Sequence, residues 1–295
     1  MRASTAYPVH CAGRLADALR LTEEGLELTG EDPSVGAGIA YACPHAILLF
    51  LRAMMLGFLG RLPEGFANVE LALQVGRKVN DLEVQGWAHA LWPWLAHWAG
   101  GDADLALAHA RRGVEVTERT GGAFSRAHAY ASLAEAHLLG RAWDAAEVAC
   151  LQALALMHSN HTCLENEPMV HLRLARARLG AGRVAEAGSA AEDGLRLSRE
   201  RGHVIAEVQA RSALTQVLLA EAAPDATRIR SELNEALALT ERTGFLSCQP
   251  QIHLRRAELA RLTGDDERAA QAFDLAYRQF TAIGAEGWAK EMAAR

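Results

Sequence analysis

The sequence predicts an all-α fold, a right-handed solenoid built from helical hairpins. Half of its 295 residues are hydrophobic and only 6% are aromatic, and the dominant residues are alanine and leucine, which favour helices over strands. In segments such as 126–139 the apolar residues recur at steps of three and four, which places them on one face of a helix. A turn motif also returns about every 40 residues, which is typical of stacked helical repeats.

The turn motif marks the end of each predicted unit. It is most regular in ERTGG (118–122), ERTGF (241–245) and RERGH (199–203). Glycines or residues standing in for them recur at 81, 121, 161, 202, 244 and 284, which are 40 to 42 residues apart. A second glycine lies halfway through each unit, followed by an acidic residue, as in GDADLAL (101–107). Each unit is therefore expected to be a helix, a tight turn, a second helix and a glycine end.

This repeat covers nearly the whole chain, so we expect residues 1–295 to form a single solenoid domain. The domain would begin with a leading half unit at 1–30, because only about a dozen residues precede the first clear helix. A flexible joint is expected at 30–40, where Pro33, Gly36 and Gly38 interrupt the period. Six helical hairpins would follow over 41–295.

The G-R/D-x-x-E/D-A turns, together with helix endings such as CLQALAL (150–156) and LNEALAL (233–239), resemble the tetratricopeptide-type helical repeats. Units of about 40 residues are similar to the longer version found in large bacterial signalling ATPases. The segment 272–293 resembles the closing part of the C-terminal repeat region of adenylate-cyclase-like and LuxR-like ATP-binding regulators. No GxxxxGK[ST] phosphate loop occurs in the sequence, so we expect an excised or naturally free-standing sensor region.

The resemblance also predicts which side chains face the concave groove of the solenoid. Matched to the tetratricopeptide pattern, these are Phe50, Met54, Leu95, Trp98, His128, Glu135, Arg176, Glu258 and Arg261. Such a groove would be apolar near the N-terminal end and charged near the C-terminal end, which suits an amphipathic protein or peptide segment. The alternative is a groove that faces only water or another domain of a larger protein.

The stretch GWAHALWPWLAHWAG (86–100) holds four of the six tryptophans. On a helix, Trp87, Trp94 and Trp98 share one stripe and Trp92 points almost oppositely. We interpret this stretch as core packing, because the first helix of a solenoid unit is contacted on several sides. The alternative is that some of these rings line an inner pocket.

Other residue patterns do not predict a metal, cofactor or catalytic site. His158, His161 and Cys163 in HSNHTC are zinc-ligand types, but a fourth ligand at motif spacing is lacking. The other histidines are scattered and no serine lies in a GxSxG turn. The five cysteines form no CxxC pair, as expected of reduced thiols in a cytoplasmic protein.

Charge and hydropathy limit the classes of partner. The net charge of −6 argues against direct binding to nucleic acid or to anionic membranes. The longest apolar run, AILLFL (46–51), is too short to span a bilayer, so we expect a soluble, cytoplasmic protein.

The function that the sequence predicts is therefore non-catalytic. We expect a scaffold that binds a protein or peptide in its groove, as the regulatory or sensor region of a bacterial signalling or transcription-regulating protein. One alternative is a sensor for a small-molecule effector, which a closed apolar pocket near Trp94 and Trp98 would favour. Another is an enzyme on a helical scaffold, which a buried, perturbed histidine–acid pair in a cleft would favour. An exposed end unit could also pair two copies as a homodimer.

Overall fold

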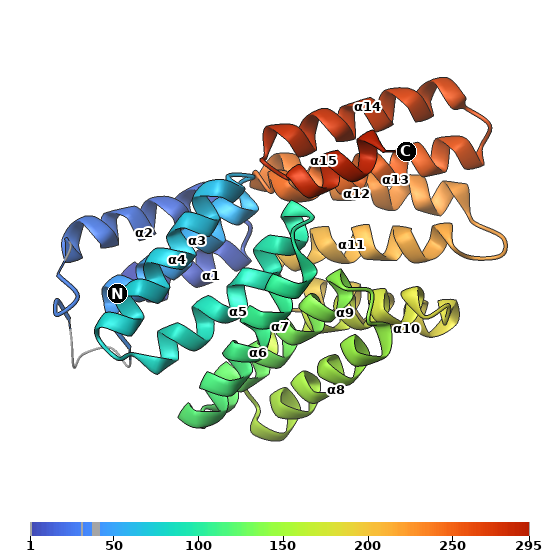
Figure 1. Cartoon of the computed structure of the whole chain (residues 1–295). Helices are drawn as coiled ribbons and strands as arrows, with labels where there is room; N and C mark the ends of the chain where they lie inside the picture. Colours follow the sequence, from blue (N-terminus) through green and yellow to red (C-terminus); the bar gives the residue numbers. More distant parts are fainter. Residues whose placement is uncertain (1, 31, 37–41, 295) are drawn as a thin grey trace.

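The chain is a stack of antiparallel α-helices in the computed structural model, which describes residues 2–30, 32–36 and 42–294 (Figure 1). Its helices are α1 (Arg2–Cys11), α2 (Leu15–Thr29), α3 (Pro44–Phe58), α4 (Leu62–Lys78), α5 (Leu82–Ala99), α6 (Ala103–Thr120), α7 (Ala123–Leu139), α8 (Trp143–Asn160), α9 (Glu167–Gly180), α10 (Val184–Glu200), α11 (Val204–Leu219), α12 (Ala226–Thr243), α13 (Gln249–Leu262), α14 (Asp266–Ala282) and α15 (Glu286–Ala293). Two short 3₁₀ turns, η1 (Leu164–Asn166) and η2 (Leu246–Cys248), precede α9 and α13. The described residues contain no strand, and the all-α solenoid prediction is confirmed.

Consecutive helices pack against each other as hairpins, from α3 with α4 to α13 with α14. At the N-terminal end α1 packs against α2, where the sequence predicted a half unit. The flexible joint expected at 30–40 falls partly on residues 31 and 37–40, which lie outside the described residues. The division of the chain into one domain with these boundaries stays a prediction.

The unit ends adopt left-handed backbone, as the glycine repeat predicted. Gly121 has a φ of 76°, and where the repeat lacks glycine His161 has a φ of 47°. In the second unit the residue in this conformation is Asn80, with a φ of 53°, and not position 81. Asp81 instead caps α5 by accepting a hydrogen bond from the Val84 amide at 3.1 Å. The physical reason is that asparagine tolerates the left-handed region, whereas aspartate is a favoured N-cap.

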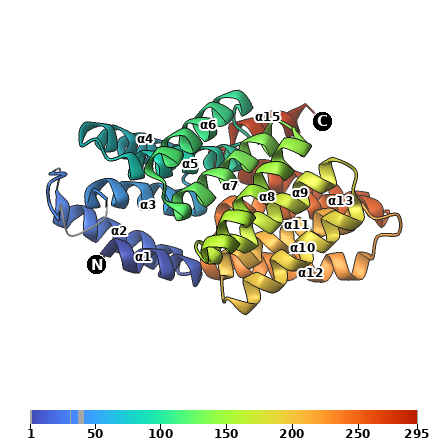
Figure 2. The same cartoon turned by 90° about the horizontal axis from the view of Figure 1, so that it is seen from below.

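The two ends of the solenoid contact each other (Figures 1 and 2). Helix α1 packs against α11, α3 against η2, and α5 against α15. Phe245 is fully buried at this contact. Its ring lies edge-on to Phe58, with ring centroids 4.9 Å apart, and to Trp98, with centroids 5.3 Å apart. The superhelix is therefore closed, and its inner face forms part of the core.

Hydrogen bonds reinforce this contact between the ends, which we call the closure contact. The Ser247 hydroxyl donates to the carbonyl oxygen of Gly57 in α3. In the same region, Trp288 Nε1 donates to the carbonyl oxygen of His97 at 2.9 Å. These bonds satisfy buried polar groups that an open solenoid would leave to water.

The four tryptophans of α5 are buried, as the core interpretation predicted, and Trp98 also lines an inner cavity, as the alternative predicted. Each is 4–9% exposed. Trp92 stacks on His109 of α6, with ring centroids 4.6 Å apart. Trp94 and Trp98 lie on the other side of the helix, toward the closure contact. Trp87 donates from Nε1 to the Ser125 hydroxyl of α7 at 2.8 Å. Because α5 is contacted on all of these sides, its large rings pack rather than forming an open cage.

Within the described part of the chain, no helix combines the length and the apolar character needed to cross a bilayer.

The closure contact predicts a cost for adding one methyl group at Gly287. A Cβ there would overlap the backbone carbonyl of Gly100, because α15 meets the end of α5 backbone to backbone. We expect Gly287→Ala to lower the free energy of unfolding by about 1–3 kcal/mol through overpacking, measured by urea denaturation. The matched control is Gly188→Ala in α10, where an added Cβ meets only Val217 Cγ1 at 3.8 Å. This control should be neutral or stabilising by up to about 1 kcal/mol. Equal stability of both variants would contradict the placement of α15.

Candidate functional site in the interior of the solenoid

A cavity of about 130 Å³, partly open to solvent, lies on the inner face of the closed solenoid. The helices around it are the first helices of five successive units, α5, α7, α9, α11 and α13, together with η2 and α15. This arrangement follows from the repeat, because equivalent helices of a solenoid line the same face. The lining residues are His97, Trp98, Glu135, Met169, Leu172, Arg173, Arg176, Gln209, Ser212, Ala213, Gln216, Cys248, Gln251, Arg255 and Trp288.

The charged centre of this cavity is the carboxylate of Glu135, which is 2% exposed. Arg173 Nε donates to one carboxylate oxygen and an Arg176 Nη donates to the other, each at 2.8 Å. The two arginines are three residues apart on α9, so their side chains leave the same face of that helix. The second Nη of Arg176 donates to His97 Nδ1 at 3.0 Å.

The electrostatic environment keeps both acid–base groups in one protonation state. Burial acts to raise the pKa of Glu135, but Arg176, His97 and Arg173 lower it more, so the pKa lies well below its usual range. Burial, and then the charge of Arg176, lower the pKa of His97 to about 3. Since an arginine can only donate, His97 Nδ1 is the acceptor and its proton is on Nε2.

This histidine–acid pair has the geometry that would favour an enzyme, with His97 Nδ1 3.3 Å from a Glu135 oxygen. The protonation states of His97 and Glu135 do not suit acid–base catalysis. A histidine with a pKa of about 3 and a carboxylate held by two arginines do not exchange protons near neutral pH. The pair acts as a fixed part of the cavity wall.

The cavity offers more hydrogen-bond donors than acceptors. Three arginines and one glutamate line it. Two further donors, Trp98 Nε1 and Gln209 Nε2, are buried and have no hydrogen-bond partner among the described residues. A buried donor without a partner costs free energy. Oxygen acceptors on a ligand, a carboxylate above all, would complement this cavity.

The structure brings three of the nine predicted groove residues together at the cavity: Trp98, Glu135 and Arg176. Leu95 is fully buried and its side chain lies against Gly57 of α3. Phe50 is half-buried, with its ring centroid 5.9 Å from that of Trp87.

The other predicted groove residues are not in the cavity lining. Met54 is half-buried against the core. His128 lies beside Cys163 and Glu165. Glu258 pairs with Arg255, with an Oε1–Nη distance of 2.7 Å. Arg261 is exposed and its guanidinium carbon lies 5.9 Å from the centre of the Phe273 ring.

Sequence reasoning missed Arg173, Gln209 and Arg255, which also line the cavity. A signal for Arg173 was present, because it precedes Arg176 by three residues and therefore shares its helix face. The other two residues reach the cavity only because the solenoid curves around it, and no local pattern marks them.

A larger hollow of about 440 Å³ lies between α10, α11 and α12. Two of its charged lining residues, Arg228 and Glu192, are paired with each other. The interior cavity is the better candidate site, because it also holds two buried donors without partners, Trp98 Nε1 and Gln209 Nε2.

The comparisons with known proteins agree with this architecture. No protein-family model and no curated protein matches the sequence. Among solved structures, a Rap protein complexed with Competence and Sporulation Factor matches with a TM-score of 0.59 and 10% identity over 99% of this chain and 97% of that chain. The apo form of RapI matches with a TM-score of 0.59 and 9% identity over 95% and 98%.

A third similar structure contains tetratricopeptide repeats. A signal transduction ATPase with numerous domains from Pyrococcus horikoshii, which has a tetratricopeptide repeat sensor, matches with a TM-score of 0.50 and 14% identity over 99% of this chain. The chain has a tetratricopeptide-type fold. It spans less than half of that ATPase, 43% of its length, and at these identities the likeness concerns the fold alone.

The buried network predicts a large effect of removing the charge of Glu135. In Glu135→Gln two arginines would be left without their carboxylate inside the protein, so we expect the free energy of unfolding to fall by about 3–5 kcal/mol. The control is Glu186→Gln on α10, whose side chain is 53% exposed beside Arg178 and Arg183 and should cost less than about 1 kcal/mol. Chemical denaturation of both variants measures the difference. Similar small losses would show that Glu135 is not the centre of a buried network.

Buried histidines predict a loss of stability as the pH falls from 7 to 5. Burial lowers the pKa of His10 and His97 to about 3 and that of His203 to about 4. Below pH 6.5 the unfolded chain therefore binds protons that the folded chain does not. Each such group removes up to about 1.4 kcal/mol of stability per pH unit in this window. We expect the urea midpoint to fall steadily from pH 7 to pH 5.

The variant His203→Asn tests this explanation. His203 caps α11 by accepting from the Ala206 amide at 3.1 Å, and asparagine can also cap but does not titrate. The variant should show a shallower dependence on pH. A flat profile in the original protein would contradict the burial of these rings.

Proposed function

We propose that this protein is a non-catalytic scaffold whose interior binds an acidic group of a protein or peptide segment. The observation that carries the proposal is the excess of positive charge in the cavity lining, which holds Arg173, Arg176 and Arg255 but only one carboxylate, that of Glu135. Arg173 and Arg176 each use one nitrogen to bind Glu135. Arg255 pairs with Glu258, which is not in the cavity lining. An incoming carboxylate would therefore meet guanidinium groups that still have free donors.

The size of the cavity defines what can enter it. A volume of about 130 Å³ is well above the roughly 10–15 Å³ that a cavity needs to hold one water molecule. It can hold one side chain or one chain end. A longer segment would need the inner face to widen, and α15 and η2 cover that face through the closure contact. Binding would then change the relative position of the two ends. This change in shape would allow the scaffold to act as a sensor of the bound segment.

The fold comparisons support this proposal. A Rap protein of similar fold forms a complex with Competence and Sporulation Factor, and the ATPase of similar fold carries a tetratricopeptide repeat sensor. In our proposal the chain acts as a regulatory or sensor region of a bacterial, cytoplasmic signalling or transcription-regulating system.

A small-molecule effector is the second candidate, and the cavity beside Trp98 favours it. The pocket differs from the apolar one expected for such a sensor, because three arginines line it and Trp94 does not. The effector would accordingly be a small carboxylate.

The test uses a random peptide library selected against the purified chain, followed by affinity measurements on the selected peptides. We expect acidic peptides to be enriched. Arg255→Gln should weaken their binding at least about tenfold, because a desolvated, charge-assisted contact is lost. This residue is chosen because its partner Glu258 is partly exposed, so the variant leaves no deeply buried charge.

The matched control is Arg268→Gln on α14, whose side chain is 81% exposed and which should bind within twofold of the original protein. Enrichment of basic peptides, or equal binding by both variants, would contradict the proposal. Thermal stabilisation by free small carboxylates without any peptide binding would favour the effector.

A further inference from the structure

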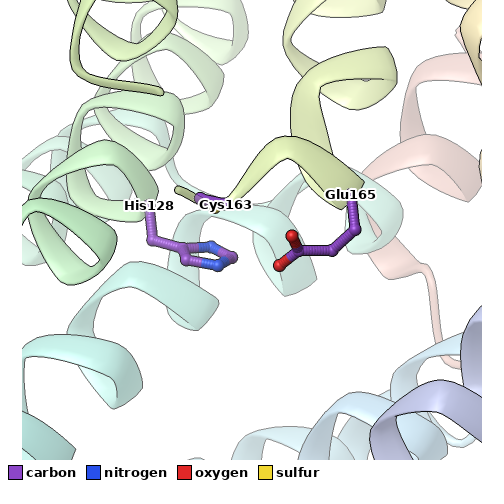
Figure 3. A group of neighbouring side chains, drawn as sticks. All are labelled: His128, Cys163 and Glu165. Carbon is purple, nitrogen blue, oxygen red and sulfur yellow. The ribbon is translucent and has the colours of Figure 1, made fainter. Parts of the chain in front are cut away.

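A second polar cluster lies away from the cavity, at the turn between α8 and α9. His128 comes from α7, and Cys163 and Glu165 come from the turn (Figure 3). One imidazole nitrogen, the Sγ and one carboxylate oxygen all lie within 4.8 Å of one another. The figure shows the imidazole and the carboxylate pointing toward each other across the gap between their two segments.

The sequence had grouped Cys163 with His158 and His161, and the structure separates them. The His158 Nε2 lies 2.7 Å from a carboxylate oxygen of Glu167, and His161 is exposed at the end of α8. Cys163 is 3% exposed and turns toward α7 instead. Its partner there, His128, is 35 residues away along the chain and could not be found from motif spacing.

The backbone holds Cys163 in an uncommon conformation. Its φ is 56°, in the left-handed region that side chains other than glycine, asparagine and aspartate seldom adopt. Such conformations cost free energy and gather at functional sites. The result of this one is that a buried thiol faces an imidazole and a carboxylate.

A single amide group lies at the centre of the cluster. The distances from Asn166 Nδ2 are 2.7 Å to the Tyr7 hydroxyl oxygen, 3.1 Å to Glu165 Oε1, 3.4 Å to His128 Nε2 and 3.7 Å to Cys163 Sγ. An amide nitrogen has only two hydrogens to donate. Four potential metal ligands from three separate segments therefore converge on a group that can serve only two of them.

We propose that His128, Cys163 and Glu165 bind one Zn²⁺ ion, with the Tyr7 hydroxyl or a water molecule as fourth ligand and the Asn166 amide turned aside. Imidazole, thiolate and carboxylate are the ligands of tetrahedral zinc, at about 2.0–2.3 Å from the ion. Side chains within 4.8 Å of each other reach this geometry by small rotations.

The charges balance at this site. Binding breaks the S–H bond of Cys163, forms a sulfur–zinc bond and releases one proton to solvent. The two negative charges of the Cys163 thiolate and the Glu165 carboxylate then neutralise the ion, so no net charge is buried. With Tyr7 of α1 as the fourth ligand, the ion would connect the first unit of the solenoid to its middle units.

The test is a titration of the full chain, freed of metal with a chelator, first with Co²⁺ and then with Zn²⁺ as competitor. We expect one ion per chain and a thiolate-to-cobalt absorption band. Calorimetry should give one Zn²⁺ per chain, with release of a proton. Cys163→Ser should abolish the band and weaken Zn²⁺ binding at least tenfold, and Glu165→Gln should weaken it by a similar factor.

His161→Asn is the control, since it changes an imidazole in the same turn and asparagine accepts the left-handed backbone there. It should bind as the original protein does. Zn²⁺ should raise the melting temperature of the original protein and of this control but not of Cys163→Ser.

Circular dichroism establishes that each variant is folded. Glu165 is only half-buried, so Glu165→Gln tests the site even if the serine variant does not fold. Absence of the thiolate-to-cobalt band, or Zn²⁺ binding that neither variant weakens, would overturn the proposal. Either result leaves the peptide-binding proposal unaffected, because no residue is shared between the two sites.

Discussion

The packing of Phe245 against Phe58 and Trp98 joins units from opposite ends of the chain. A solenoid that stays open exposes its inner face to water, and each unit buries apolar surface only against its neighbours. Here the ends meet, so the inner face becomes interior. Large apolar rings on several sides of α5 are stabilising for this reason, because every side of that helix has a partner and no wide apolar surface is left exposed.

Closure also explains why the one acidic group in the cavity lining, Glu135, is held by two arginines. A carboxylate as buried as that of Glu135 is tolerated only when hydrogen-bonded cations offset its loss of hydration. Arg173 and Arg176 provide them from the next unit. The low effective dielectric of the interior strengthens the attraction of the remaining donors for any acceptor that enters. A ligand and the closure contact would therefore act on the same helices.

The cavity and the cysteine-containing cluster are built in a similar way at two places. Glu135 with Arg173, and His128 with Asn166, each join residues 38 positions apart in neighbouring units. Each place is then completed by a residue from far along the chain. At the cavity, Trp288 meets His97 across 191 positions, and at the cluster Tyr7 meets Asn166 across 159 positions. Contacts between neighbouring units position the polar side chains of each site. Contacts between residues far apart in the sequence add the remaining side chains around them.

The sequence by itself determined the helices, their turns and the repeat of about 40 residues, because glycine, N-cap and apolar spacings act over a few residues. From their place in the repeat it also predicted that Trp98, Glu135 and Arg176 face inward, and these three residues line the cavity. Only the tertiary structure decided that Leu95 is buried, that Arg255 and Gln209 reach the same cavity, and that His128 meets Cys163. The physical reason is that the curvature of a solenoid is the sum of small rotations between units. Local sequence patterns do not specify the total curvature. That curvature brings the two ends of the solenoid into contact.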